Sequence, residues 1–369
     1  MSAPGFDPPA RFVSTRYQGS KQRSFDLFER ALRPLCFESA VDLFGGTGAV
    51  SWLFKSWGKR VHFNDCLRWC AEVGTALVEN AATRLDPARA EELLVPLAGR
   101  RYDDFVARTF GGRFFLPEED RFIDVVAQNV AAEPDRHARA LGFYALFQAC
   151  LKKRPFNLFH RANLAVRLRD VPRSFGNKAT WESPFERLFL EALAEANEAV
   201  FDNGQDNTVS CLDALACPLE ADLVYLDPPY VRRDGAAFDY LDGYHFLEGL
   251  VEYDRWGERI DRRYKHLPFA RRPSPFSSGA ALHEALREIV ARAKSARYVA
   301  VSYRDDGIPS IEQIEQMLRG EGRSVVRFSR SVSYALSHRK GAEVVLVGER
   351  GASVSPGRRR RVAPENRRR

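Results

Sequence analysis

The sequence lacks the long apolar runs and the cysteine and histidine patterns that mark several classes of protein. No apolar run approaches the roughly 18 residues of a membrane-spanning helix, and residues 1–13 lack the apolar core of a signal peptide. The six cysteines form no CxxC pair, and the seven histidines form no HExxH motif. We therefore expect a cytoplasmic protein with reduced, mostly buried thiols, no membrane segment and no protein-bound catalytic metal.

Net positive charge is scarce outside the C-terminus. The formal net charge is +7, of which residues 358–369 contribute +6 through seven arginines and one glutamate. The rest of the chain is nearly neutral, so a site for a polyanion within it must come from local clusters of cations. We expect residues 350–369 to form a basic, disordered tail, which is either merely solvated or attracts phosphates non-specifically.

Apolar residues make up 45% of the chain and charged residues 28%, as in ordinary globular proteins. Runs rich in β-branched residues alternate with amphipathic stretches, which predicts an α/β sheet. The expected strands are Ala40–Phe44, Arg60–Phe63, Thr208–Leu212, Leu223–Leu226, Tyr298–Tyr303, Val325–Val332 and Glu343–Gly348. The last two should form an antiparallel hairpin at the end of an otherwise parallel sheet. Covering helices are expected at Phe25–Leu35, Ala49–Trp57 and Ala281–Ala296.

The expected sheet domain is discontinuous. It comprises residues 14–80, 201–230 and 279–349, and two long segments interrupt it. Residues 81–200 are mostly helical in character, whereas residues 231–278 are irregular and rich in tyrosine and arginine. A crossover between parallel strands needs only about a dozen residues, so both segments predict added subdomains on one rim of the sheet.

Two motifs lie at the expected ends of neighbouring strands. Residues 42–48 read Asp-Leu-Phe-Gly-Gly-Thr-Gly, and glycines at a strand-to-helix turn let a ligand approach the backbone closely. Asp65 ends the next strand, where a carboxylate can accept both hydroxyl protons of a ribose. Together these features indicate a cofactor that contains a nucleoside.

A third motif, Asp-Pro-Pro-Tyr at residues 227–230, follows the apolar strand Leu223–Leu226. Two prolines remove two backbone donors and leave a rigid turn rich in hydrogen-bond acceptors, which suits an amino group. Tyr230 adds a flat face for stacking. The same three letters, Asp-Pro-Pro, recur at residues 7–9 without a preceding strand or an aromatic residue, and we assign that copy no function.

The order of these motifs resembles the DNA adenine methylase family. The resemblance rests on Tyr-Gln-Gly-Ser-Lys at residues 17–21, the glycine motif at 42–48, Asn64-Asp65, and Asp-Pro-Pro-Tyr at 227–230. It implies a seven-stranded, Rossmann-like methyltransferase sheet that uses S-adenosyl-L-methionine. It also implies transfer of a methyl group to the N6 atom of a flipped adenine in double-stranded DNA, with residues 81–200 as the region that recognises the target.

The resemblance assigns roles to individual residues. Asp227 and the Pro228 carbonyl would accept the N–H groups of the target amine, with Pro229 and Tyr230 completing the catalytic turn. The residues that would hold the cofactor are Tyr17, Lys21, Asp42, Phe44, Gly46, Gly48, Asp65 and Asp213. No covalent intermediate is needed, and the Pro-Cys pair typical of cytosine-C5 enzymes is absent from the chain.

Cations and aromatic residues alternate between residues 152 and 161, which is typical of nucleic-acid contacts. The DNA-binding residues we expect are Lys152, Arg154, Asn157, Arg161 and Arg232. The alternative for the first four is a solvated face with a buried pair of phenylalanines. Residues 262–266 have a similar but less specific character.

Three other functions remain open from the sequence. The same chemistry could act on RNA or on a glutamine amide of a protein, and the chain could be an inactive DNA-binding subunit. Asp rather than Asn at the first position of the Asp-Pro-Pro-Tyr motif favours adenine over glutamine.

Overall fold

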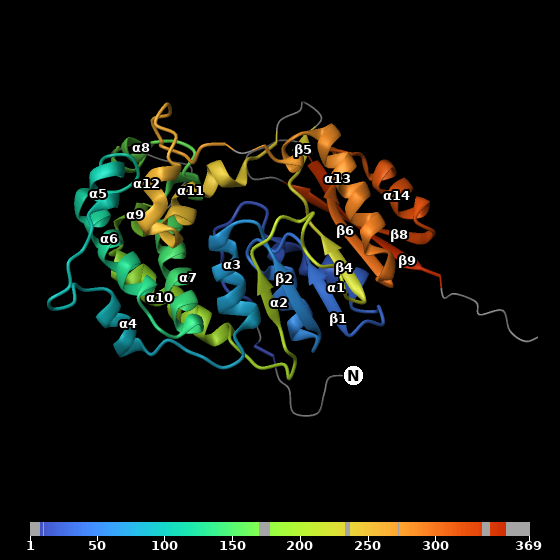
Figure 1. Ribbon diagram of the computed structural model, residues 1–369, viewed down its shortest axis with the longest axis horizontal. Helices are drawn as coiled ribbons and strands as arrows, with labels where there is room; N and C mark the ends of the chain where they lie inside the picture. Colours follow the sequence, from blue (N-terminus) through green and yellow to red (C-terminus); the bar gives the residue numbers. More distant parts are fainter. Residues whose placement is uncertain are drawn as a thin grey trace, which may run out of the picture.

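The computed structural model describes residues 8–9, 11–169, 178–232, 237–271, 273–333 and 340–351. Almost all of the basic tail expected at residues 350–369 lies outside these described residues. Within the described ranges, no helix is long and apolar enough to cross a membrane, and no group of acidic, histidine or cysteine side chains is arranged to hold a metal ion. Figure 1 shows a sheet domain, with the helices of both insertions gathered at one end of the molecule.

All seven expected strands are present and form a single sheet in the order β3-β2-β1-β4-β6-β9-β8. They are β1 (Ser39–Asp42), β2 (Arg60–Asn64), β3 (Thr208–Ser210), β4 (Leu223–Leu226), β6 (Tyr298–Arg304), β8 (Arg323–Ser333) and β9 (Lys340–Arg350). The first five run parallel, and β9 is antiparallel to both β6 and β8. The α/β class and the terminal hairpin are therefore confirmed. A further pair, β5 (Val231–Arg232) and β7 (Gly307–Ile308), is too short to leave a sequence pattern.

Both faces of the central sheet are buried, which explains the continuous apolar runs of its strands. Along β6, Tyr298 and Ala300 join one apolar core, while Val299 and Val301 join the core on the other face. The helical elements of this domain are η1 (Lys21–Ser24), α1 (Phe25–Leu32), α2 (Ala49–Ser56), α3 (Arg68–Gly74), η2 (Thr75–Glu79), η5 (Pro275–Ser277), α13 (Gly279–Arg292), η6 (Ala293–Ser295) and α14 (Ile311–Gly320). Helices α1 to α3 pack on the first face, and α13 and α14 on the second. The three expected helices are confirmed, with ends shifted by a few residues.

The first insertion is helical, as expected. Its elements are α4 (Pro87–Leu93), α5 (Phe105–Phe110), α6 (Pro117–Ala131), α7 (Arg136–Lys152), η3 (Pro155–Asn157), α8 (Leu164–Leu168), α9 (Lys178–Glu182) and α10 (Phe185–Ala199). Helix α7 is the central one, because its residues from Ala140 to Leu151 are all buried. The second insertion contributes α11 (Tyr240–Val251), η4 (Tyr253–Arg255) and α12 (Trp256–Arg259).

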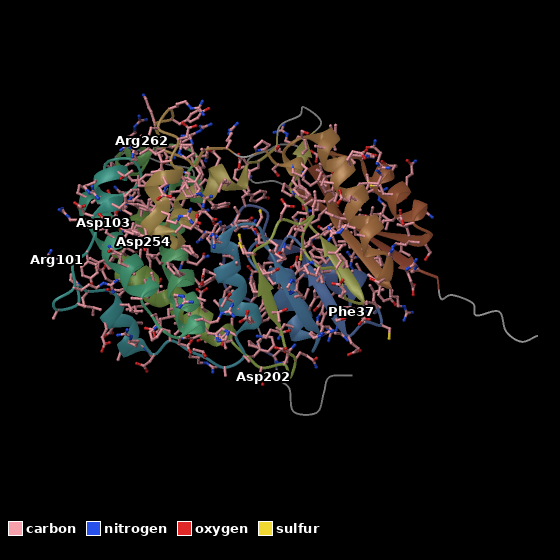
Figure 2. The ribbon with its side chains drawn as sticks, in the orientation of Figure 1. Phe37, Arg101, Asp103, Asp202, Asp254 and Arg262 are labelled. Atoms are coloured by element: carbon pink, nitrogen blue, oxygen red, sulfur yellow. The ribbon has the colours of Figure 1, made fainter. Side chains whose placement is uncertain are left out.

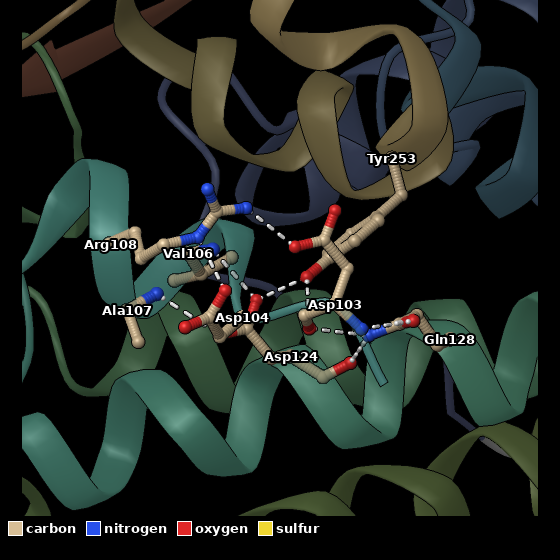
Figure 3. Close-up of polar contacts among 8 residues, drawn as sticks. All are labelled: Asp103, Asp104, Val106, Ala107, Arg108, Asp124, Gln128 and Tyr253. Atoms are coloured by element: carbon tan, nitrogen blue, oxygen red, sulfur yellow. Dashed lines mark hydrogen bonds and ion pairs between the residues drawn. The ribbon is translucent and has the colours of Figure 1, made fainter. Parts of the chain in front are cut away.

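The two insertions pack against each other, which the sequence did not predict. Figure 3 shows Asp124 of α6 accepting hydrogen bonds from the backbone N–H groups of Val106 and Ala107 at the start of α5. The Tyr253 hydroxyl of the second insertion donates a hydrogen bond to the same carboxylate. Burial raises the pKa of Asp124, and these three donors oppose the rise. One carboxylate thus ties both insertions together.

The second insertion also supports the carboxyl end of β2. Glu248 of α11 is buried and accepts hydrogen bonds from the backbone N–H groups of Arg68 and Trp69, at distances of 3.2 and 3.1 Å. These N–H groups belong to the first turn of α3, where an acidic group is stabilised by the helix dipole. Helix α11 is therefore fixed beside the strand ends where the glycine motif and Asp65 lie.

Candidate active site

A cavity lies at the carboxyl ends of β1, β2 and β4, where open α/β sheets bind ligands. It brings together residues from four of the sequence motifs. The predicted residues that line it are Tyr17, Lys21, Asp42, Phe44, Gly46, Asp65, Asp227 and Pro229. Residues as far apart in the chain as Tyr17 and Asp227 therefore meet at one site, as the resemblance implies.

The glycine motif gives the cavity its floor. Gly46 and Gly48 have φ angles of 52° and 75°, a left-handed conformation that favours glycine. Gly45 is required for a different reason, because a Cβ atom there would lie 2.1 Å from the ring of Phe63. Gly48 does not line the cavity but is the N-cap residue of α2, whose first residues Ala49 and Val50 do.

Asp65 fixes the glycine turn and faces the same cavity. Its Oδ2 accepts a hydrogen bond from the Gly46 N–H at 2.9 Å, and its Oδ1 accepts one from the Leu67 N–H at 2.9 Å. Burial raises the pKa of Asp65, and these bonds oppose the rise. A carboxylate can accept several hydrogen bonds, and Asp65 faces the cavity, so it can receive a hydroxyl group of a ligand.

Asp42 is almost fully buried at the end of β1. Its Oδ2 accepts a hydrogen bond from the Ser51 hydroxyl at 2.7 Å. Burial raises the pKa of Asp42 to about 7, and the nearby Asp227 adds to the rise. Among the described residues, three buried oxygens on side chains of the cavity have no hydrogen-bond partner, namely Ser20 Oγ, Asp42 Oδ1 and the Tyr225 hydroxyl. Unsatisfied buried oxygens are costly, so this cavity suits a polar ligand.

The Asp-Pro-Pro-Tyr turn places Asp227 directly beside the cavity. Lys21 Nζ lies 3.0 Å from Asp227 Oδ1, and the Tyr230 hydroxyl donates a hydrogen bond to the same oxygen at 2.8 Å. Burial raises the pKa of Asp227, while Lys21 acts in the opposite direction. The Tyr230 ring packs edge-on against Tyr303 at 5.1 Å, which fixes its orientation. Pro228 is buried within the turn.

Tyrosines from the second insertion complete one wall of the cavity, and the sequence did not predict this role. Tyr17 stacks on Tyr244 with ring centroids 4.9 Å apart and on Tyr240 at 5.6 Å. Tyr240 itself lines the cavity. The only available signal was the i, i+4 spacing of the two tyrosines, which places them on one face of a helix.

The match to known proteins decides the family. Residues 17–249 match the D12 class of N6 adenine-specific DNA methyltransferases, and this span is more than half of the chain. The protein belongs to this family. Membership identifies it as an adenine DNA methyltransferase, and it disfavours RNA, a glutamine amide or an inactive subunit as the explanation of the motifs.

Named bacterial relatives of this methyltransferase support the same conclusion. The chain is 26% identical to the Type II methyltransferase M2.HphI of Haemophilus parahaemolyticus, over 85% of this chain and 90% of that protein. It is also 26% identical to the Type II methyltransferase M.NlaIII of Neisseria lactamica, over 83% and 88% of the two chains. The Type II methyltransferase M.FokI of Planomicrobium okeanokoites is 23% identical, and there the match covers 47% of the relative.

Like Gly48, Asp213 is a predicted cofactor residue of the methyltransferase that does not line the cavity. It is exposed in the loop after β3, and its carboxylate accepts a hydrogen bond from the Leu215 N–H at 2.8 Å. Its role in cofactor binding stays a prediction.

Arg154 corrects one prediction of a DNA contact. Its guanidinium is buried and donates to the carbonyl oxygens of Leu158, Phe114 and Arg161 and to the Asn163 side chain. Burial lowers the pKa of Arg154 to about 9. Arg154 was wrongly assigned to DNA binding because a sequence does not reveal that main-chain carbonyl groups surround a cation. Arg154 instead holds together the loop that follows α7.

The other predicted DNA contacts are accessible to different degrees. Arg161 and Arg232 are exposed, and Lys152 and Asn157 are half-buried. Asn157 and the exposed Phe156 both have positive φ angles, 56° and 63°, so the loop that presents them has an unusual backbone. Figure 2 shows Arg262 at the outer end of the second insertion, on the hairpin-like segment closed by the bridge between Ile260 and Phe269.

Proposed function

We propose that this methyltransferase transfers a methyl group from S-adenosyl-L-methionine to the N6 atom of a flipped adenine at a specific site in double-stranded DNA. The observation that carries the proposal is the position of the Asp227 carboxylate at the rim of a glycine-floored cavity. A cofactor bound there lies next to a hydrogen-bond acceptor that suits an amino group.

The cavity residues fit the cofactor. Asp65 would hold the ribose hydroxyls with the two oxygens that also fix the glycine turn. Asp42, whose Oδ1 has no partner among the described residues, would receive the cationic end of the cofactor. Gly46 allows the close approach, and Tyr17 borders the same space. When bound, the cofactor supplies an electrophilic methyl group on a sulfonium sulfur.

Asp227 and the Pro228 carbonyl would activate the target nitrogen. The lone pair of the adenine amino group is delocalised into the ring, so the nitrogen is a poor nucleophile. Two acceptors that each take one N–H concentrate electron density on the nitrogen and orient it for direct in-line transfer. Lys21 and Tyr230 both contact Asp227 Oδ1 and thereby fix the carboxylate.

The target base must leave the duplex to reach this site. Tyr230 lies beside the acceptors, and stacking on its ring would offset part of the cost of extruding the base, at about 1–3 kcal/mol per base. The edge-on contact with Tyr303 holds that ring in place. We expect Arg161, Arg232, Lys152 and Asn157 to contact the duplex on the side of the insertions. Because three relatives are named Type II methyltransferases, we also propose a cytoplasmic role in a restriction-modification system.

Transfer of labelled methyl from S-adenosyl-L-methionine to unmethylated duplex DNA tests the proposal. The DNA is digested to nucleosides and analysed by mass spectrometry. N6-methyladenine is the expected product. Transfer only to RNA or to protein would refute the proposed substrate, and cofactor binding without transfer to any of the three would point to an inactive subunit.

Cofactor affinity should depend on pH through Asp42. A cationic group near this carboxylate favours its ionised form, so binding releases a proton whenever the pH lies below the raised pKa of about 7. Affinity should therefore rise as the pH increases from about 6 to 7 and then level off. Isothermal titration of the wild type and Asp42→Asn measures this directly. The cofactor's own amino group titrates equally in both proteins, so the difference between their curves of affinity against pH gives the contribution of Asp42. Curves of identical shape would exclude a contact between Asp42 and the cationic end of the cofactor.

Arg161 and Arg154 provide a matched pair of arginines, of which the first is expected to bind DNA and the second to stabilise the fold. Arg161→Ala should weaken duplex binding about 10-fold and reduce the salt slope by about 1, because one phosphate or base contact is lost. Arg154→Ala should lower the free energy of unfolding by about 3 kcal/mol, because buried carbonyl groups lose their donor. Binding titrations at several salt concentrations and denaturant unfolding measure the two effects. Loss of stability in Arg161→Ala with normal DNA affinity would reverse this assignment.

A further inference from the structure

A buried glutamate from the far end of the chain reaches the catalytic corner. Lys21 Nζ lies 3.2 Å from Glu343 Oε1 as well as 3.0 Å from Asp227 Oδ1. The side chains of Lys21, Glu343 and Asp227 are only 7%, 12% and 17% exposed. Ser24 donates a hydrogen bond to the other oxygen of Glu343, which fixes the carboxylate on β9. Neither the sequence motifs nor the proposed mechanism uses Glu343.

The geometry gives Lys21 three acceptors for its three N–H groups. These are the Asp227 carboxylate, the Glu343 carboxylate and the Tyr230 hydroxyl. Burial alone would lower the pKa of Lys21, but Asp227, Tyr230 and Glu343 outweigh burial and raise it well above its usual value. Lys21 therefore stays an ammonium ion, and two carboxylates share its single charge.

Sharing Lys21 matters because Asp227 must remain an acceptor. Both Lys21 and Tyr230 contact the Oδ1 atom of Asp227, so the Oδ2 side of the carboxylate can take the N–H of the target amine. A lysine paired with Asp227 alone would be free to bridge both oxygens and compete with the amine. Glu343 gives the ammonium a second carboxylate partner, with its Oε1 atom 3.2 Å from Lys21 Nζ, and so restrains the ammonium beside Asp227 Oδ1.

We propose that Glu343 is a positioning residue for methyl transfer, which shares the Lys21 ammonium with Asp227 and so keeps one oxygen of Asp227 open to the target amine. The inference rests on the proposed role of Asp227. It concerns a residue on β9 that becomes a neighbour of Asp227 only through the fold.

Other ionisable groups also face Asp227, so variants whose pH profiles of kcat are compared must leave these groups unchanged. Apart from Lys21, Glu343 and Tyr230, the neighbours are Asp42 on β1, Tyr225 on β4, Tyr240 on α11 and Tyr303 on β6. None of them is altered by a substitution at position 343. The negative charge of Glu343 raises the pKa of Asp227, so removing that charge should lower it.

Glu343→Gln is the decisive variant, with Glu349→Gln as its control. Glu349 lies on the same strand but is partly exposed and pairs with Arg297 at the surface. Glu343→Gln should lower kcat about 10-fold, since a misplaced catalytic group costs rate rather than substrate affinity. The KM for the cofactor should stay unchanged, and the acidic limb of the pH profile should move to lower pH. Glu349→Gln should match the wild type in all three.

Two conservative variants separate charge from packing. Glu343→Asp keeps the charge, so its acidic limb should stay in the wild-type position while kcat falls only in part. Ser24→Ala should lower kcat about 3-fold by loosening Glu343, and it replaces Glu343→Gln as the test if that protein does not fold. A Glu343→Gln enzyme with wild-type kcat and an unmoved acidic limb would overturn the inference. So would a lower kcat that is accounted for by a smaller folded fraction while the acidic limb of the remaining enzyme stays in the wild-type position.

Failure of the proposed function can be distinguished from failure of the inference about Glu343. If the wild type does not methylate adenine in DNA, or if Asp227→Ala is fully active, then the proposed role of Asp227 is wrong whatever Glu343 does. If Asp227→Ala is inactive and Glu343→Gln behaves like Glu349→Gln, then only the inference about Glu343 fails.

Discussion

Replacing Asp227 with alanine should lower kcat for adenine methylation by on the order of 10³-fold, as expected when a preorganised polar group at the reacting centre is removed. The cofactor cavity should survive, because Lys21 keeps Glu343 and the Tyr230 hydroxyl as partners. Cofactor affinity should therefore change by no more than about 3-fold. Single-turnover methyl transfer to duplex DNA, combined with isothermal titration of the cofactor, measures the two quantities separately.

Two variants sharpen the Asp227 experiment. Asp227→Asn keeps one acceptor oxygen and should retain more activity than alanine. Asp7→Ala removes the acid of the second Asp-Pro-Pro sequence, at residues 7–9, and should match the wild type. Full activity of Asp227→Ala with normal cofactor binding would show that the amine is activated elsewhere. Equal losses of activity and cofactor affinity would instead assign Asp227 to cofactor binding rather than to activation of the amine.

The centre of the sheet could be predicted from the sequence because strands β1, β4 and β6 are buried on both faces. Strand β4 (Leu223–Leu226) is a continuous apolar run that ends one residue before a proline pair, and its predicted bounds match the structure. Strands β5 and β7 left no signal, since two residues cannot show periodicity. Most of the cavity was predictable for a related reason, since its residues come from strand ends and adjoining turns marked by glycine, proline and acid.

The remaining parts of the site depend on contacts that only the fold creates. Glu343 lies within a strand whose sequence predicts a hairpin, and its pairing with Lys21 brings together opposite ends of the chain. Tyr240 comes from an insertion that has no periodic link to the cavity. Arg154 is the opposite case, a residue that was predicted to contact DNA but is buried. An arginine in a basic run is usually solvated, whereas this one is surrounded by carbonyl oxygens.

Replacing Asp65 with alanine should weaken cofactor binding about 100-fold. Two hydrogen bonds from ribose hydroxyls to a carboxylate contribute about 1.5 kcal/mol each, and 3 kcal/mol corresponds to roughly a 100-fold change in Kd. Asp65 also accepts the N–H groups of Gly46 and Leu67, so the glycine turn loses its support in the same variant. Titration with S-adenosyl-L-methionine gives the Kd, and methylation at saturating cofactor should recover much of the wild-type rate.

Two further variants test whether cofactor binding needs both carboxylate oxygens of Asp65, and whether Asp65 rather than Asp213 binds the nucleoside end of the cofactor. Asp65→Asn replaces one acceptor with an NH₂ group, which would face the N–H of either Gly46 or Leu67, so its affinity should fall nearly as far as that of alanine. Asp213→Ala removes the predicted cofactor acid that lies outside the cavity and accepts the Leu215 N–H. Its effect should be smaller than 10-fold, because an exposed hydrogen bond contributes little. A larger loss of affinity in Asp213→Ala than in Asp65→Ala would move the nucleoside end of the cofactor from β2 to the loop after β3.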